Sequence, residues 1–586
     1  MLTALLLATA IDTAILPPTI PWNGASRRLV VAADDPWITP SERGQLRTTP
    51  DYDETVAYLR RLVAASRELQ MVSIGRSAEG RDIWLVIASK ERAFTPEALR
   101  RTNKSVVFAQ AGIHAGEIDG KDAGLMLLRD MTVRGTKREL LDRASFLFVP
   151  IFNADGHERS SRFSRINQRG PEESGWRTTA QNYNLNRDYM KADTPEMRAM
   201  LRALDTWQPD LYIDLHVTDG SDYQYDLTYG GNVATGWSPA IARWMTATFR
   251  PAIDAALKEM GHIPGPLIFT DDPAGGIGDD PDDPRLSTGY GDARHMATVL
   301  VENHSLKPYD QRVLATYVFL EQVLRLVAKD AAALREATRA AREAKVSDVP
   351  LSWHVLPDSP KSTVELLGIE RREVLSPVSG GVRVEWLGKP VTMRVPYNVG
   401  SVATSVDRPA AYWVPSSWRE IIEKLDLHGI RYERIAGPRE VDVTMYRLGE
   451  PEYGKAQFEG HVRVTAPASP LRRREHFPAG SVRVPTDQPL GTLAVLLLEP
   501  SSPDSLFQWG FFHSILAPTE YVENYIMEPM AERMLAEDPK LAAEFHEKVE
   551  HDAEFRGNAQ ARLQWLYERT PFYDERARLY PVGREE

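Results

Sequence analysis

Two apolar, strand-like segments of this chain end in side chains that bind metal ions. Val106 to Ala109 precedes His114 and Glu117, and Leu211 to Leu215 runs directly into His216. Imidazole and carboxylate groups suit zinc, and a zinc ion that keeps an open position takes about three protein ligands. The His-x-x-Glu spacing alone also fits a loop histidine beside a surface glutamate. The third ligand, at another strand end, favours one zinc ion per chain held by His114, Glu117 and His216.

Two further segments offer polar side chains that could take part in a reaction. Thr298 to Val301 is a third buried-looking strand, and it ends in Glu302, a carboxylate that is costly to bury without a partner. Asn186 and Arg187 place an amide beside a guanidinium, which binds carboxylates through two parallel hydrogen bonds. The alternatives are a strand-end ion pair for Glu302 and a structural salt bridge from Arg187 to Asp188.

The order of these motifs resembles the zinc carboxypeptidase family, the carboxypeptidase A-like enzymes also called funnelins. The resemblance covers residues of about 45 to 330. It runs through a leading helix, an early hairpin, the zinc pair, an Asn-x-Asp-Gly element, the Asn-Arg pair, the second histidine and a final glutamate. The matching segments are Tyr52 to Glu68, Ser73 to Ile83, His114 with Glu117, Asn153 to Gly156, Asn186 with Arg187, His216 and Glu302.

The resemblance implies an activity, namely hydrolysis of the C-terminal peptide bond of peptides. Zinc lowers the pKa of the water it binds to about 7 and polarises a carbonyl group. The family pattern assigns Glu302 the role of general base, which takes the water proton and passes it to the leaving amine. Asn186 and Arg187 are expected to hold the free C-terminal carboxylate of the substrate, which selects the last peptide bond.

An arginine is expected near the developing oxyanion. Arg177 lies nine positions before Asn186, an offset that resembles the oxyanion arginine of cytosolic family members. Arg165 and Arg169 are competitors at longer offsets, and a solvated loop position is the alternative for all three.

The sequence departs from the family pattern at two positions. Asn184 stands where members usually carry an aspartate that orients the first zinc histidine. Its carbonyl oxygen can still accept the imidazole N–H, but without charge, so we expect a somewhat lower metal affinity. No tyrosine stands at the expected distance before Glu302, and Tyr290 is the nearest candidate for the family's mobile, substrate-binding tyrosine. Arg285 is a candidate for selecting an acidic terminal residue, or else a surface arginine.

Composition limits the class of protein. A length of 586 residues suggests two to four domains, and 42% hydrophobic with 26% charged residues fits an ordinary globular chain. The net charge of −12 argues against nucleic-acid binding. The absence of cysteine excludes disulfides, thiol catalysis and cysteine-ligated zinc.

The N-terminus is apolar and ends in Ala-x-Ala, which is typical of a signal peptide, although no Lys or Arg precedes the apolar run. Residues 1–25 are therefore interpreted as a signal segment of a secreted or periplasmic protein. A disordered start to a cytoplasmic protein is the alternative. No run reaches the length of a transmembrane segment.

Alternating strand and helix patterns predict an α/β catalytic domain over residues 45–330, with a mixed, mostly parallel sheet flanked by helices. Residues 348–505 are expected to form a β-rich accessory domain and residues 506–586 a helical C-terminal region. The partner of that region is unknown. Beyond the catalytic domain, strand-like runs lie at 364–397, 441–464 and 482–498, and helical runs lie at 418–428 and 524–569.

Three other functions remain open at the level of sequence. A zinc deacylase or amidase acting on N-acyl amino acids or cell-wall peptides would use the same zinc, glutamate and arginines. A binding module of the same fold would keep the ligands without hydrolysis. A structural protein that carries these motifs by accident would bind no zinc.

Overall fold

A computed structural model describes residues 15–270, 272, 275–278, 280–344, 346–355, 362–517 and 520–586. The apolar run of the predicted signal segment lies outside these residues. Within the described ranges, no helix is long and apolar enough to cross a membrane.

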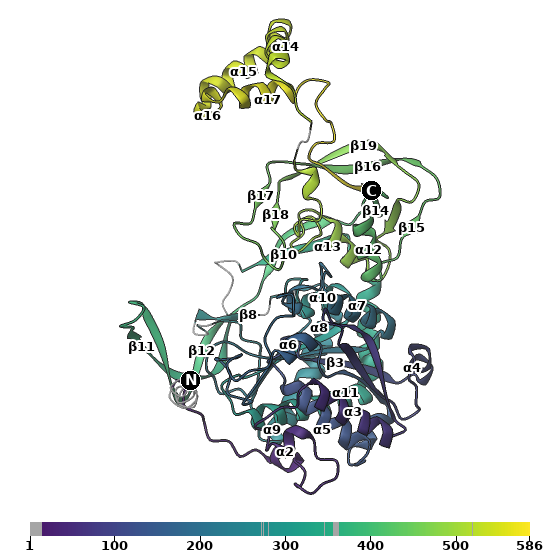
Figure 1. The fold of residues 1–586 in the computed structure, drawn as a ribbon, viewed down its shortest axis with the longest axis vertical. Helices are drawn as coiled ribbons and strands as arrows, with labels where there is room; N and C mark the ends of the chain where they lie inside the picture. The colour runs from purple at the N-terminus through teal and green to yellow at the C-terminus, as the bar shows by residue number, and fades with distance from the viewer. Residues whose placement is uncertain are drawn as a thin grey trace.

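The lower, larger part of the molecule in Figure 1 is built around the sheet that contains β3. This sheet has eight strands in the order β1-β2-β4-β3-β5-β9-β6-β7. The four inner strands β4, β3, β5 and β9 are parallel, while β1, β2 and β6 join antiparallel. The predicted class, a mixed and mostly parallel sheet flanked by helices, is confirmed. The strands are β1 (Leu69–Arg76), β2 (Asp82–Ala88), β3 (Ser105–Ala111), β4 (Ala144–Val149), β5 (Leu211–Val217), β6 (Leu227–Gly231), β7 (Pro264–Gly265) and β9 (Ala297–Asn303).

The inner strands are buried on both faces, which is why their sequences are almost continuously apolar. Every residue of β3 is buried, with Phe108 in the core on one face and Val107 in the core on the other. Parallel pairing of β5 with β9 sets His216 directly beside Glu302. The carboxyl ends of these strands therefore share one edge of the sheet, where open α/β sheets bind ligands.

Helices cover both faces of the sheet. Helices α3, α5, α9 and α11 pack into one core, and α7 packs into the other. The predicted leading helix ends at Ala65, because Leu69 already begins β1. The helices and turns of this part are η1 (Ala25–Leu29), α2 (Pro40–Arg43), α3 (Tyr52–Ala65), α4 (Pro96–Thr102), α5 (Asp119–Met131), η2 (Arg138–Asp142), α6 (Ala154–Glu158), η3 (Leu185–Arg187), α7 (Pro195–Trp207), α8 (Pro239–Trp244), η4 (Met245–Phe249), α9 (Arg250–Glu259), α10 (Ser287–Ala293) and α11 (Tyr309–Glu343).

The accessory region is built on a six-stranded sheet in the order β15-β20-β14-β21-β16-β19. Separate pairs are formed by β10 with β13 and by β17 with β18, and a long hairpin of β11 and β12 adds the short β8. The strands are β8 (Ile277–Gly278), β10 (Asp348–His354), β11 (Ser362–Leu375), β12 (Val382–Asn398), β13 (Ser401–Asp407), β14 (Ala411–Val414), β15 (Glu433–Arg434), β16 (Arg439–Leu448), β17 (Glu452–Tyr453), β18 (Val464–Thr465), β19 (Ala468–Phe477), β20 (Val482–Pro485) and β21 (Leu579–Glu585). Its helices are α12 (Arg419–Leu427), α13 (Gly491–Leu498) and the turn η6 (His513–Ile515).

Two features of this region differ from the sequence prediction. The run at 482–498 is a strand only to Pro485, and Gly491–Leu498 is a fully buried helix. An all-apolar stretch buried on every side has no periodicity that separates helix from strand. The chain also does not end in helices, because β21 pairs with both β14 and β16 inside the six-stranded sheet.

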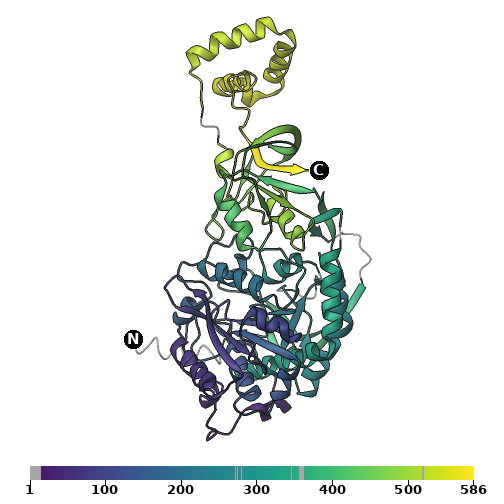
Figure 2. The same ribbon diagram turned by 90° about the vertical axis from the view of Figure 1, so that its right-hand side faces the viewer.

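Helices α14 (Asn524–Glu537), α15 (Pro539–His551), α16 (Ala553–Gly557) and α17 (Ala559–Tyr567) are therefore an insertion before the last strand. They form a small unit with its own core around Phe545, Phe555 and Leu566. Figures 1 and 2 show this unit projecting from the rest of the molecule in both views.

The six-stranded sheet and the eight-stranded sheet share one hydrophobic core. Val414, Ile421 and Leu493 of the accessory region belong to the same cluster as Leu201 of α7 and Phe108 of β3. The accessory region is thus packed on the α7 side of the eight-stranded sheet by continuous apolar contact, rather than tethered by a linker.

The strand β21 generates a prediction about stability. Arg584 donates to the buried carboxylate of Glu499 at 3.0 Å, and Tyr412 donates to the same oxygen at 2.6 Å. Replacing Arg584 with Met leaves a buried carboxylate without its cation, which costs about 3 kcal/mol. We expect that loss in the free energy of unfolding of the accessory region, measured by urea denaturation. Arg474→Met on the exposed strand β19 is the matched control, and equal stability of the two variants would contradict this role of the last strand.

Candidate active site

Four of the predicted site residues meet at the carboxyl edge of the sheet. His114 and Glu117 lie on the loop between β3 and α5, His216 near the end of β5 and Glu302 near the end of β9. One ligand atom from each of His114, Glu117 and His216 lies within 4.8 Å of the others. These residues and Glu302 line a cavity of about 490 Å³.

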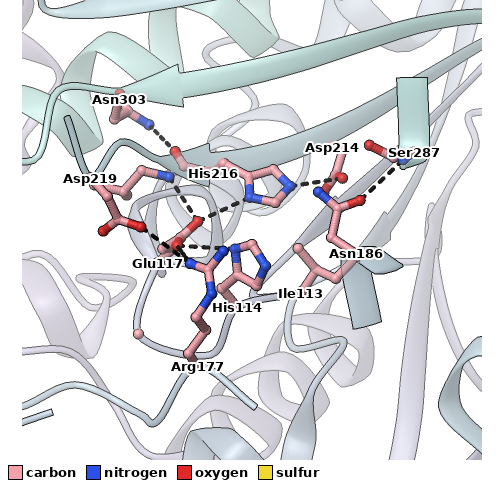
Figure 3. Close-up of polar contacts among 12 residues, drawn as sticks. Ile113, His114, Glu117, Arg177, Asn186, Asp214, His216, Asp219, Ser287 and Asn303 are labelled. Carbon is pink, nitrogen blue, oxygen red and sulfur yellow. Dashed lines mark hydrogen bonds and ion pairs between the residues drawn. The ribbon is translucent and has the colours of Figure 1, made fainter. Parts of the chain in front are cut away.

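The two imidazoles are each held from behind by a fixed oxygen. His114 Nε2 lies 2.9 Å from Asn184 Oδ1, and His216 Nε2 lies 2.8 Å from Asp214 Oδ2. The Nδ1 atoms of both rings lie 3.0 Å from the Glu117 carboxylate. Figure 3 shows both rings directed at this carboxylate. The contact between Asn184 and His114 is the one predicted for this departure from the family pattern.

This geometry fits a cation. Asn184 Oδ1 also accepts the backbone N–H of Asn186 at 3.0 Å, so it is an acceptor and His114 Nε2 must be the donor. Burial lowers the pKa of His114 to about 4, so the ring is neutral near pH 7 and its Nδ1 carries a lone pair. That lone pair faces a carboxylate oxygen, and a metal ion bound between the two removes the repulsion.

The neighbouring charges stabilise ionised ligands. Burial disfavours charge on Glu117, but the cations around it, Arg165 among them, hold the pKa of its carboxyl well below the usual range. Burial likewise opposes charge on His216, yet the Asp214 carboxylate raises the pKa of this imidazole well above its usual value. Without metal, a proton on His216 therefore supplies part of the positive charge that the carboxylates demand.

Glu302 is a carboxylate at the cavity wall with an unsatisfied oxygen. Its Oε2 atom is buried and has no hydrogen-bond partner in the described residues. Burial raises the pKa of the Glu302 carboxyl to about 8, with His216 opposing the shift and Glu117 adding to it. A carboxylate kept free of structural partners beside a metal-type cluster is suited to exchange protons.

Two arginines contact the cluster. Arg177 Nη1 donates to Glu117 Oε1 at 3.1 Å, and Arg165 Nη1 donates to the same atom at 2.9 Å. The Arg177 side chain is 36% exposed and lines the cavity, whereas that of Arg165 is 7% exposed. Arg169 instead donates to the backbone oxygens of Leu306 and Pro17. Arg177 is thus the cavity-facing candidate of the three.

Asn186 and Arg187 lie on the turn η3 and also line the cavity. The alternative salt bridge from Arg187 to Asp188 is absent, since Asp188 pairs with Lys191 at 2.6 Å. Arg187 Nη1 donates only to the backbone oxygen of Asn186, and no described carboxylate lies within ion-pair distance of it. Burial, helped by Arg177 and Arg285, lowers the pKa of this guanidinium, as expected for a cation that lacks a counter-ion.

Comparison with known proteins points to the same family as the resemblance in the sequence. Residues 55–261 match the family profile described as zinc carboxypeptidase. The chain contains a zinc carboxypeptidase domain. It is 20% identical over 528 residues to carboxypeptidase 2 of Trichophyton tonsurans, covering 85% of this chain and 91% of that relative.

Two other similarities are more limited. The inactive metallocarboxypeptidase ecm14 of Schizosaccharomyces pombe is 33% identical over 108 residues, which cover 17% of this chain and 21% of that protein. The crystal structure of carboxypeptidase A from Helicoverpa armigera superimposes with a TM-score of 0.37 and 18% identity, covering 54% of this chain and 80% of that chain. Since one relative is named inactive, similarity to the family does not by itself establish hydrolysis.

Two predictions about substrate contacts in the carboxypeptidase domain receive no support from the geometry. Tyr290 is fully buried on α10, does not line the cavity, and its hydroxyl lies 2.8 Å from His428 Nδ1. Arg285 forms ion pairs with Asp283 at 2.6 Å and Asp504 at 3.0 Å, so its charge is already compensated. We propose no substrate role for either residue.

The sequence interpretation missed two residues of the site. Asp214 precedes His216 by two positions on β5, and residues so spaced share one face of a strand, so this signal was available. Asp219 lies in the loop after β5 and forms ion pairs with Arg165 at 2.9 Å and with Arg177 at 3.4 Å. Nothing in the sequence connects Asp219 with those distant arginines.

The neutral amide of Asn184 generates a prediction about metal affinity. Asn184→Asp places a negative charge on the oxygen that accepts from His114, which makes the imidazole a stronger ligand. We expect zinc to bind about tenfold more tightly, measured by competition with a chromophoric chelator. Asn182→Asp, exposed in the same loop, is the control for added charge. An unchanged dissociation constant for Asn184→Asp would show that this oxygen does not tune the site.

Proposed function

We propose that this protein is a zinc-dependent carboxypeptidase that removes the C-terminal residue of peptides. His114 and His216 would hold the metal through Nδ1, together with the carboxylate of Glu117. Zinc bound there supplies a Lewis acid that activates water and polarises a carbonyl group. The single observation that carries the proposal is Glu302, a partner-free carboxylate paired in register beside His216.

Glu302 acts as the general base. Its free Oε2 accepts a proton from the attacking water and then delivers that proton to the nitrogen of the leaving amine. Arg177, on the cavity wall, donates to the negative charge that develops on the carbonyl oxygen.

The cut is placed at the last peptide bond by the turn η3. Arg187 is a cavity-lining cation with no described carboxylate partner, and Asn186 lies beside it. A terminal carboxylate binds such a guanidinium through two parallel hydrogen bonds. Endopeptidase substrates present a neutral peptide group at this point and leave the half-buried cation uncompensated, which supports exopeptidase action.

Hydrolysis of N-acyl amino acids remains the second candidate, because those substrates carry the same terminal carboxylate. A peptide library and a set of N-acyl amino acids, digested in parallel with and without a chelator, separate the two by mass. Release of single C-terminal residues supports the carboxypeptidase, whereas internal cuts would exclude it. Export of the chain stays a prediction from its apolar N-terminus.

The role of Glu302 predicts the behaviour of Glu302→Gln. The amide cannot accept the water proton, so we expect kcat to fall by about 10²–10⁴-fold. Zinc content, measured by atomic emission, should stay at the wild-type level because Glu302 is outside the ligand cluster. Glu259→Gln, on the exposed surface of α9, serves as the control. Full activity in Glu302→Gln would remove the general base from the mechanism.

The carboxylate clamp predicts the behaviour of Arg187→Met. Loss of two charge-assisted hydrogen bonds should lower kcat/KM for a free-acid peptide by on the order of a hundredfold, about 3 kcal/mol. The preference for the free acid over the C-terminal amide of the same peptide should shrink in parallel. Arg202→Met, exposed on α7, is the matched control. An unchanged preference in Arg187→Met would place the carboxylate elsewhere.

A further inference from the structure

A tight hairpin of the accessory region reaches the active-site turn η3. It connects β17 with β18, and at its tip Phe458 and His461 exchange two backbone hydrogen bonds of 2.7 and 3.1 Å. The two residues between them, Glu459 and Gly460, have φ of 50° and 82°. Such a turn favours Asn and Gly. Glutamate at positive φ is strained, so this residue is unfavourable for the turn itself.

The tip is fixed against the segment that carries η3. His461 Nε2 lies 2.7 Å from Asp193 Oδ2, and Phe458 stacks on the buried ring of Trp509 at 5.8 Å. Gly460 lies so close to Tyr183 that an added Cβ would come within 2.5 Å of the ring. A side chain at Gly460 would therefore push the tip away, and the glycine permits the close approach.

Glu459 uses this position to hold the backbone of a site residue. Its Oε2 accepts the N–H of Asn184 at 2.8 Å. The side chain of Asn184 in turn accepts from His114 Nε2 at 2.9 Å and from the backbone N–H of Asn186 at 3.0 Å. One carboxylate of the accessory region thus fixes the residue that orients a metal-type imidazole and the turn that carries the carboxylate clamp.

A second contact joins the accessory region to the catalytic domain. The buried carboxylate of Asp504 receives Arg285 from the catalytic domain at 3.0 Å and Arg463 from the accessory region at 2.7 Å. Arg463 also lies over Trp509, with its guanidinium carbon 4.2 Å from the ring centre. The hairpin that carries Glu459 is therefore anchored on both sides.

We propose that Glu459 is a positioning residue of the active site, supplied by the accessory region, which holds Asn184 and through it His114. This role rests on the proposed function, since it assigns Glu459 to the metal site of the carboxypeptidase. It makes the accessory region part of the catalytic apparatus rather than a separate module.

The strained turn allows the positioning role to be separated from a structural one. Glu459→Gly deletes the carboxylate but relieves the positive φ, so the metal-free protein should melt at the same or a higher temperature. Its zinc dissociation constant should nevertheless rise about tenfold in a chelator competition. In Glu459→Gln the amide oxygen can still accept the Asn184 N–H, so its affinity should stay within about twofold of wild type. Glu452→Gln, exposed on the same hairpin, should match wild type in both measurements.

Zinc affinity in Glu459→Gly equal to that in Glu452→Gln would overturn the proposal. So would a loss of affinity that appears only together with a lower melting temperature and is not restored by Glu459→Gln. Hydrolysis is measured separately on the same proteins. A chain that binds zinc but cleaves no peptide contradicts the proposed function and still yields the affinity comparison that decides the role of Glu459.

Discussion

The site depends on one electrostatic constraint, the burial of Glu117 between two imidazole Nδ1 atoms. Each ring is held from behind by an oxygen, from Asn184 for His114 and from Asp214 for His216, so both Nδ1 atoms stay directed at the carboxylate. A buried carboxylate is unfavourable without positive charge beside it. In the metal-free protein Arg165, Arg177 and a protonated His216 supply that charge, and a cation held by the two Nδ1 atoms and Glu117 would take the place of the His216 proton.

The order of the strands brings Glu302 next to this cluster. Because β5 and β9 are parallel neighbours, His216 and Glu302 emerge side by side at the same edge. The loop after β3 brings His114 and Glu117 to that edge, and the turn η3 supplies a cation some way along the cavity wall. Under the proposed function, the metal ligands, the proton acceptor and the carboxylate clamp are then separate groups around one cavity, which is the separation that hydrolysis of a terminal peptide bond would require.

The parts that the sequence predicted are those set by local pattern. Apolar runs define β3, β5 and β9, and the polar residues that follow them must lie at the carboxyl edge of the sheet. The metal cluster and Glu302 could therefore be predicted from the sequence. Contacts between distant segments carried no such signal. The Asp219 pairs, the contact of Glu459 with Asn184 and the return of β21 into the accessory sheet depend on tertiary packing. The burial of Tyr290 away from the cavity likewise could not be read from its distance to Glu302 in the sequence.

The most direct test is a crystal structure of the zinc-loaded protein with anomalous data at the zinc edge. One peak within bonding distance of His114 Nδ1, His216 Nδ1 and the Glu117 carboxylate, with Glu302 nearby but not coordinated, is the predicted result. A peak at another place, or a further side chain such as Glu302 or Asp219 bound to the ion and closing its open position, would contradict a hydrolytic zinc site.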